Sequence, residues 1–141
     1  MMLTTKGRYA VMAMVYLAMN KNRNTPTTIA DIAEKQSIPL NYLEQIFVRL
    51  RKNDIVQSVK GPGGGYTLAK DLSEISIAEI IHAVEEPIKI VRCTNDGLAG
   101  CMPNGAKCAT HDLWDELGIK IEAYLTSVTL EDFKNGKFSN A

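Results

Sequence analysis

The fold is decided by residues 28–53, which read TIADIAEKQSIPLNYLEQIFVRLRKN. Thr28, with an aspartate three residues later, has the spacing of a capping box, in which both side chains bind free N–H groups at a helix start. A short helix is therefore expected to about residue 36. Pro39 disfavours helical geometry in the residue before it but suits a first helical turn, which predicts a second helix over residues 40–53. Two helices joined by so short a turn form a candidate helix-turn-helix, although plain helical bundles contain such pairs too.

A glycine-rich hairpin is predicted directly after this pair. Residues 55–59 and 66–69 have the composition of short strands, and KGPGGG at residues 60–65 has that of the loop between them. A phosphate-binding loop is disfavoured because no Lys-Ser/Thr pair follows the glycines and the chain enters a strand rather than a helix. A first helix, capped by a threonine, is predicted over about residues 4–20. The expected fold class is mainly α-helical with a small β-hairpin wing, a winged helix-turn-helix.

The charge distribution points to a polyanionic partner. The chain is 45% apolar and 23% charged, as globular proteins are. Its net charge of zero conceals an uneven distribution, because residues 1–70 contain ten Lys/Arg and four Asp/Glu, whereas residues 71–141 contain six and twelve. Unless this segregation is chance, one surface binds a polyanion and another repels it. No apolar run approaches the roughly 18 residues of a membrane span, so we expect a cytoplasmic protein with no membrane partner.

Double-stranded DNA is the expected polyanion, and the second helix of the pair and the wing supply most of the candidate contacts. Glu44 can accept a hydrogen bond from a cytosine amino group but repels phosphate, so we expect a selectivity filter, with an ordinary surface charge as the alternative. The glycines would let the wing tip lie close to DNA, with a flexible hairpin as the alternative. The candidates are Asn41, Tyr42, Glu44 and Gln45 for bases, Lys6, Arg8, Arg49 and Arg51 for phosphate, and Lys60, Gly61, Gly63 and Gly64 in the wing.

A further helix is predicted from the capping-box spacing of Ser76 and Glu79 to about residue 85, where a proline follows. His82 on this helix is expected to be structural, because no cysteine or second histidine lies near it in the sequence. We expect the DNA-binding domain to end with this helix.

Residues 92–111 are rich in glycine and too poor in apolar side chains to order themselves by packing. They contain the spacing Cys93-x7-Cys101-x6-Cys108-x2-His111. An odd number of cysteines in one segment argues against a disulfide framework and favours a metal or redox site. The long gaps favour an iron-sulfur cluster, because zinc usually takes closer cysteine pairs, but zinc, a thiol switch and inert cysteines remain alternatives. A catalytic cysteine would leave two others surplus, so no enzyme is expected.

An amphipathic helix is predicted near the C-terminal end of the chain. The apolar residues Trp114, Leu117, Ile121, Tyr124 and Val128 advance by 3, 4, 3 and 4, which is typical of a coiled-coil seam. Barely two heptads long, the helix is not stable alone. A helix of the same molecule could cover the seam, but we favour a homodimer with C2 symmetry, which would double the basic surface.

Several strings match those of a known family: LTTKGRYA at 3–10, YLEQ at 42–45, RLRKN at 49–53, VKGPGGGY at 59–66 and KCATHDLW at 107–114. They closely resemble the winged-helix family of bacterial iron-sulfur cluster regulators, which includes the nitrite-sensitive and rhizobial iron regulators. The resemblance covers residues 1 to about 132 and implies a homodimeric transcription factor. It also implies a [2Fe-2S] cluster held by Cys93, Cys101, Cys108 and His111, although the gaps between the cysteines are a residue or two longer than is typical. In nitric-oxide-sensing relatives with a [4Fe-4S] cluster, an acidic residue near the N-terminus completes the ligand set. This chain has Arg8 in that neighbourhood, so the resemblance favours the two-iron cluster.

These features predict three parts: a DNA-binding domain over residues 1–86, a cluster-binding loop over 87–111, and a dimerisation helix with a tail over 112–141. We expect a transcription regulator that responds to its cluster and controls cluster-assembly or related genes, as a repressor or a dual regulator. A cluster-carrying redox protein and a zinc-stabilised winged-helix regulator are the rival functions. A DNA gel shift distinguishes the regulator from a redox protein. A visible absorption spectrum distinguishes an iron-sulfur cluster from zinc, because Zn²⁺ is colourless.

Overall fold

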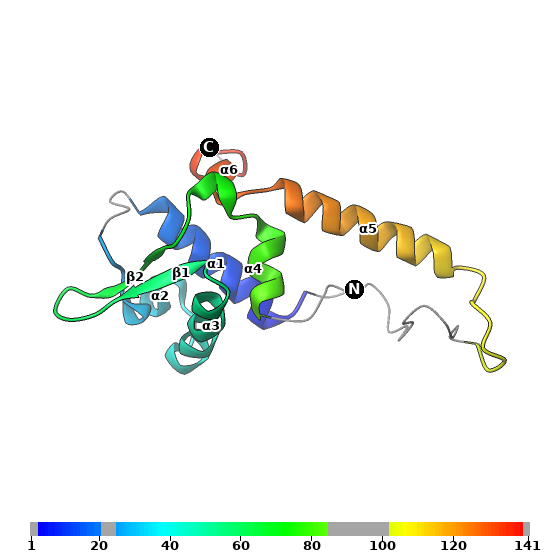
Figure 1. Cartoon of the computed structure of the whole chain (residues 1–141), viewed down its shortest axis with the longest axis horizontal. Helices are drawn as coiled ribbons and strands as arrows, with labels where there is room; N and C mark the ends of the chain where they lie inside the picture. Colours follow the sequence, from blue (N-terminus) through cyan, green and yellow to red (C-terminus); the bar gives the residue numbers. More distant parts are fainter. Residues whose placement is uncertain (1–2, 21–24, 85–101, 140–141) are drawn as a thin grey trace.

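The computed structural model describes residues 3–20, 25–84 and 102–139 (Figure 1). In chain order its elements are α1 (Thr5–Met19), α2 (Ile29–Gln36), α3 (Leu40–Lys52), β1 (Val56–Val59), β2 (Gly65–Leu68), η1 (Leu72–Glu74), α4 (Ile77–Val84), α5 (His111–Ser127) and α6 (Leu130–Lys134). Helices α1 to α4 gather at one end with the β1–β2 hairpin, and α5 extends away from them. The predicted fold class, mainly helical with a small hairpin wing, is confirmed.

Threonine hydroxyl groups begin two of the predicted helices. Thr4 accepts a hydrogen bond from the Gly7 N–H group at 3.2 Å, and Thr28 accepts one from the Asp31 N–H group at 3.1 Å. Each bond satisfies a backbone donor that has no partner within its own helix. The Asp31 carboxylate also accepts the Tyr16 hydroxyl at 3.0 Å, which ties α2 to α1. Burial and this bond to the carboxylate raise the pKa of Tyr16, so the phenol remains a donor.

The turn between α2 and α3 is fixed by backbone geometry and one apolar anchor. Ser37 has left-handed dihedral angles, φ 56° and ψ 46°, and the Ile38 N–H group donates to the Ala33 carbonyl at 3.0 Å. Ile38 is only 4% exposed. Pro39 then precedes the first turn of α3 as its N-cap, as the sequence predicts.

The core lies where α1, α3 and α4 meet. Helix α3 contributes side chains spaced three and four residues apart, which is the spacing of one helical face. Leu40 fits that spacing but is 45% exposed, because it lies in the first turn, outside the core. The fully buried side chains of the three helices include Ala10, Ala13 and Met14 of α1, Leu43, Ile46, Phe47 and Leu50 of α3, and Ile80 and Val84 of α4.

The wing is a two-stranded antiparallel sheet with an added bridge. Val56 lies opposite Leu68 in the register of β1 and β2. Thr27, before α2, exchanges backbone hydrogen bonds of 3.0 and 2.8 Å with Tyr66 on the other side of β2. A Cβ atom on Gly65 would lie 2.5 Å from the Thr27 carbonyl oxygen, so the close approach of the two backbones requires glycine here.

The start of α4 is bound to the chain that joins α5 to α6. The Ile77 N–H group donates to the Val128 carbonyl at 2.9 Å, and the Leu130 N–H group donates to the Ile75 carbonyl at 3.0 Å. The prediction that Val128 belongs to a coiled-coil seam is therefore wrong. Helix α5 ends at Ser127, and Val128 is 2% exposed because the chain leaves the helix there to pair with the start of α4.

Helix α5 has 17 residues, and none of them is buried. Its C-terminal half lies beside α4 while its N-terminal end points away (Figure 1). His82 of α4 and Glu122 of α5 join the two helices, with Nε2 and Oε1 2.5 Å apart, in agreement with the predicted structural role of His82. Despite the exposed apolar side chains of α5, no helix among the described residues is long and apolar enough to cross a membrane.

Gly65→Ala should lower the free energy of unfolding by about 2–4 kcal/mol, because the added methyl group forces Thr27 away from the wing. Gly63→Ala is the matched control, since its φ is +74° but a Cβ there meets nothing within 4 Å. The control should cost only about 1–2 kcal/mol. Urea unfolding of both variants measures the difference, and equal losses would show that the Thr27 contact does not constrain the wing.

Candidate nucleic-acid interface and metal ligands

The outward face of α3 presents side chains that can reach base edges. Asn41, Glu44 and Gln45 are all exposed at the start of the helix, as a reader of the major groove requires. Val48, which the sequence did not predict as a contact, continues the same face and is 40% exposed. Its spacing of four from Glu44 is the signal that identifies it, and an apolar side chain there can contact thymine methyl groups.

Helix α1 supports this face and adds two cations. The ring of Tyr42 is half-buried and packs edge-on against Tyr9 of α1, with centroids 5.6 Å apart, so Tyr42 anchors α3 as well as flanking the exposed face. Lys6 is half-buried and Arg8 exposed near the start of α1. Among the described residues neither cation makes a hydrogen bond or ion pair. Arg8 lines an apolar groove between α1, α4 and α5, so Lys6 is the better candidate for phosphate contact.

The two arginines near the end of α3 have different surroundings. Arg49 donates from Nη1 to the Val84 carbonyl at 2.9 Å, so its guanidinium already binds the end of α4, which the sequence did not predict. Arg51 and the wing residue Lys60 are exposed. In the described part of the chain neither has a charged or hydrogen-bonding partner, and both remain candidates for phosphate contact.

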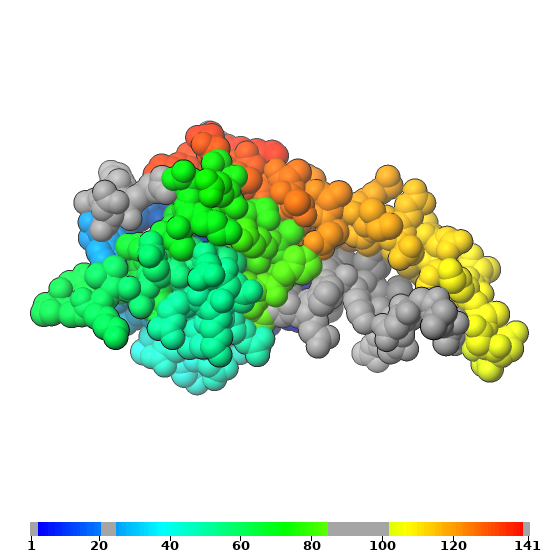
Figure 2. Space-filling model, viewed as in Figure 1, coloured from blue at the N-terminus to red at the C-terminus, as the bar shows by residue number. Residues whose placement is uncertain are grey.

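The wing tip is a tight turn that protrudes from one end of the molecule (Figure 2). The Gly64 N–H group donates to the Gly61 carbonyl at 2.9 Å, and Pro62 and Gly63, with φ +74° at Gly63, have the positions of a type II turn. A Cβ atom on Gly64 would lie 2.2 Å from the Val59 carbonyl oxygen. The wing's own backbone therefore requires this glycine, whether or not DNA approaches it.

Two of the four predicted metal ligands lie in the described residues. Cys108 and His111 are half-buried around the start of α5, and the His111 N–H group donates to the Cys108 carbonyl at 3.1 Å. Cys108 is not in a disulfide, and its sulfur lies 3.5 Å from the Thr110 hydroxyl oxygen. A thiol and an imidazole three residues apart fit half of the donor set for a metal or an iron-sulfur cluster.

The remaining two predicted ligands, Cys93 and Cys101, lie outside the described residues. Within the described ranges no three His, Cys, Asp or Glu side chains gather as a metal site. Figure 1 places the start of α5 at the end of the molecule farthest from the wing. The two described candidate ligands, at the start of α5, therefore lie far from the wing.

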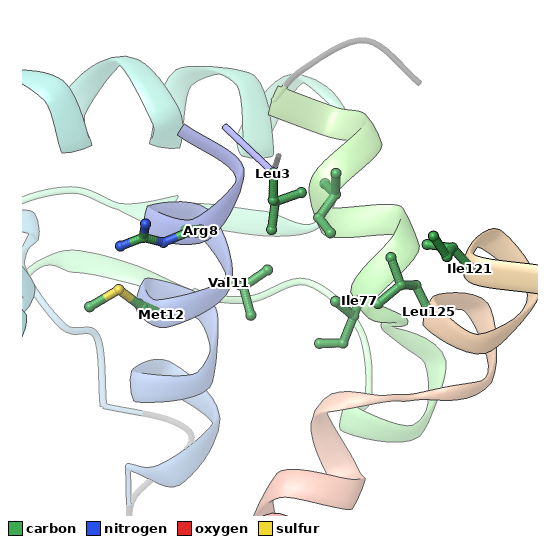
Figure 3. A pocket seen from close by; sticks show the side chains of 8 residues that line it. Leu3, Arg8, Val11, Met12, Ile77, Ile121 and Leu125 are labelled. Carbon is green, nitrogen blue, oxygen red and sulfur yellow. The ribbon is translucent and has the colours of Figure 1, made fainter. Parts of the chain in front are cut away.

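An apolar groove of about 450 Å³ lies where α1, α4 and α5 meet (Figure 3). Two of its side chains, Ile121 and Leu125, come from α5, and Ile121 also belongs to the predicted coiled-coil seam. The groove and the seam thus share one face of α5. The lining consists of Leu3, Val11, Met12, Ile77, Ile81, Ile121 and Leu125, with Arg8.

The profile of the Rrf2 family, described as iron-dependent transcriptional regulators, matches residues 3–136. The chain belongs to this family. The match spans the sequence from the start of α1 to the end of α6, so the DNA-binding elements and the C-terminal helices are both covered.

Individual members of the family agree with this assignment. The HTH-type transcriptional regulators IscR of Photorhabdus laumondii and Escherichia coli are 50% and 49% identical over 137 residues, which is 97% of this chain and 81% and 82% of theirs. The structure of T. potens IscR has a TM-score of 0.77 at 32% identity, covering 97% of this chain and 88% of that one. CymR, the global cysteine regulator of B. subtilis, has a TM-score of 0.79 at 32% identity, covering 96% and 97%. These relatives are regulators rather than enzymes, and the chain is a DNA-binding transcriptional regulator.

Glu44→Ala should widen the range of DNA sequences that the protein binds. The helix remains intact because alanine is the best helix former, while a carboxylate is removed from the DNA-facing surface. The gain should be about 1–3 kcal/mol on duplexes that lack a cytosine at the contacted position. Glu116→Ala on α5, which also removes one exposed helical acid, is the control.

Dissociation constants of both variants on a panel of duplexes, at one salt concentration, decide the role of Glu44. An equal gain on every duplex would mean that Glu44 only repels phosphate, and the selectivity interpretation would be wrong.

Proposed function

We propose that this regulator senses an iron-sulfur cluster and binds double-stranded DNA as a homodimer to control cluster-assembly or related genes. The observation that carries this proposal is the pair Cys108 and His111, a thiol and an imidazole at the start of a helix with an uncovered apolar face. The family's description as iron-dependent supports it. Because its DNA is in the cytoplasm, we propose that the protein acts there.

The proposed ligands of a [2Fe-2S] cluster are Cys93, Cys101, Cys108 and His111. When bound, a cluster supplies bonds that hold distant points of the chain together. Because such a cluster is labile, the fraction of protein that carries one depends on how many clusters are available. Cysteine binds iron as a thiolate and histidine binds it as a neutral imidazole. The affinity of the protein for the cluster is therefore expected to fall as pH falls. The hydroxyl group of Thr110, 3.5 Å from the Cys108 sulfur, is positioned to hydrogen-bond that ligand.

DNA would meet α3 in the major groove, with Asn41, Glu44, Gln45 and Val48 toward the bases. Arg51 and Lys60 would bind phosphate on either side of that contact. A protomer alone presents one such helix, whereas a twofold dimer presents two that read the halves of a palindromic site.

The bare face of α5 supports the proposed homodimer. Leu117 is 40% exposed and Tyr124 is 54% exposed on a helix that has no buried residue. A seam of barely two heptads is too short to be stable on its own. The same face continues into the apolar groove through Ile121, so a second α5 can cover the seam and the groove together. Trp114, Leu117, Ile121 and Tyr124 are the proposed contacts, and Val128 is left out because it is buried within the protomer.

His111→Ala should shorten the lifetime of the cluster in anaerobically purified protein, because one of four ligands is lost. His111→Cys should lengthen it, since a thiolate binds iron more strongly than a neutral imidazole. The chain has two histidines, and His82→Ala is the matched control because His82 pairs with Glu122 instead. The measurements are iron and sulfide content and the decay of the visible absorption.

A colourless protein that contains zinc would overturn the cluster-sensing function. If His111→Ala leaves the spectrum and the lifetime unchanged, the fourth ligand lies elsewhere. If the visible absorption decays equally fast in His82→Ala and His111→Ala, then His111 affects the cluster by stabilising the fold rather than by binding iron.

Leu117→Glu should convert the dimer to monomers, because a carboxylate in the centre of an apolar seam is buried without a partner. Ile119→Glu is the matched control, since Ile119 is 64% exposed and lies two residues along the helix, on the opposite side from the seam. Analytical ultracentrifugation of parent and variants measures the mass. A Leu117→Glu protein that remains dimeric would contradict the proposed interface.

A further inference from the structure

Arg49 links the helix that reads DNA to the helix that precedes the cysteines. It lies in the last turns of α3, at the opposite end from Asn41, and its Nη1 atom donates to the Val84 carbonyl at 2.9 Å. Val84 is the last described residue of α4. The last carbonyl groups of a helix have no partner inside it and carry the negative end of its dipole. A guanidinium therefore fits this position through charge as well as hydrogen bonding.

Helix α4 is in turn attached to α5 at two places. His82 pairs with Glu122 of α5, and Ile77 donates to the Val128 carbonyl just beyond α5. The contacts Arg49–Val84 and His82–Glu122 thus form a continuous path from α3 through α4 to the proposed dimerisation helix.

The chain that leaves Val84 leads directly to the proposed cluster ligands. Cys93 is nine residues farther along the chain, and nine fully extended residues span at most about 32 Å. Iron bound by Cys93 would therefore lie within that reach of the end of α4. At the other end of the segment, His111 is the first residue of α5 and Cys108 lies three residues before it. Both ends of the proposed cluster segment therefore join elements attached to α4.

We propose that Arg49 is a positioning residue that fixes the reading face of α3 through its bond to the end of α4, rather than a phosphate ligand, and that it relays cluster occupancy to DNA affinity. The relay rests on the proposed cluster-sensing function, whereas the positioning role does not. A bound state can shift DNA affinity only through a contact that differs between two conformations. We assign that role to the Arg49–Val84 bond, because it joins α3 to the last described residue before the cysteine-bearing segment.

The test compares Arg49→Met with Arg51→Met. Methionine keeps an apolar stem and removes the charge and the donors in both cases. Arg51, two residues away, is exposed like Arg49 but makes no bond to α4 in the described part of the chain. Full-length dimers with and without cluster are titrated with a selected duplex and a scrambled duplex across a salt series. Thermal unfolding of each variant is recorded in parallel.

Arg49→Met should lower the ratio of specific to non-specific affinity by about tenfold, the scale of one misplaced base contact, without changing the salt slope. It should also reduce the difference in affinity between the cluster-loaded and cluster-free forms. Arg51→Met should lower the salt slope by about one unit and leave the ratio intact. Arg49→Lys keeps a donor for the Val84 carbonyl, so its ratio of specific to non-specific affinity should lie between those of Arg49→Met and the parent.

Two results would overturn the positioning role of Arg49. The first is a salt slope lowered by about one unit in Arg49→Met with an unchanged ratio, which would make Arg49 a phosphate ligand. The second is a lower melting temperature with an unchanged ratio, which would make the bond merely structural. If the parent binds DNA equally with and without cluster, the proposed sensing function and the relay fail, while the ratio measured in the cluster-free protein still decides the positioning role.

Discussion

The burial of α4 against its neighbours is the constraint on which the rest of the structure depends. Five of its eight residues are buried, and it packs against α1, α3 and α5. The start of α4 is bound to the Val128 carbonyl, its middle to Glu122 of α5, and its end to Arg49 of α3. One short helix thereby fixes the direction in which α5 leaves the DNA-binding part. If α4 shifted, the reading face of α3 and the seam of α5 would shift relative to each other.

The basic surface expected to bind DNA and the acidic helix that begins at the described candidate metal ligands lie in different parts of the protein. The half of the sequence that contains the reading helix and wing is basic, and the half that contains α5 is acidic. An acidic helix keeps away from phosphate, so the charge distribution favours approach of DNA to the α3 and wing surface alone. A thiol and an imidazole at the far end of α5 are kept away from the DNA as well. In the proposed relay, α4 connects the elements that carry these groups to α3.

Local sequence signals predicted most of the fold, and long-range packing decided the rest. Threonine caps, Pro39 and the glycine-rich turn act within a few residues, and the helices and hairpin they predicted are confirmed. The 3, 4 spacing of α5 predicted an amphipathic helix but could not show that Val128 leaves it to pair with Ile77. Arg49 and Arg51 of α3 were predicted as phosphate contacts by charge alone. The bond of Arg49 to a carbonyl 35 residues away depends on how α4 packs, which no local pattern encodes.

In the proposed mechanism, the state of ligands at one end of the protein controls DNA binding at the other. The most direct measurement is the affinity of the parent protein for duplexes selected from a random pool, compared between the anaerobic cluster-loaded form and the form stripped of iron, at one salt concentration. The account predicts that on at least one class of duplex the two affinities differ by about tenfold or more, the size of an ordinary allosteric coupling. Equal affinities on every selected duplex would contradict it.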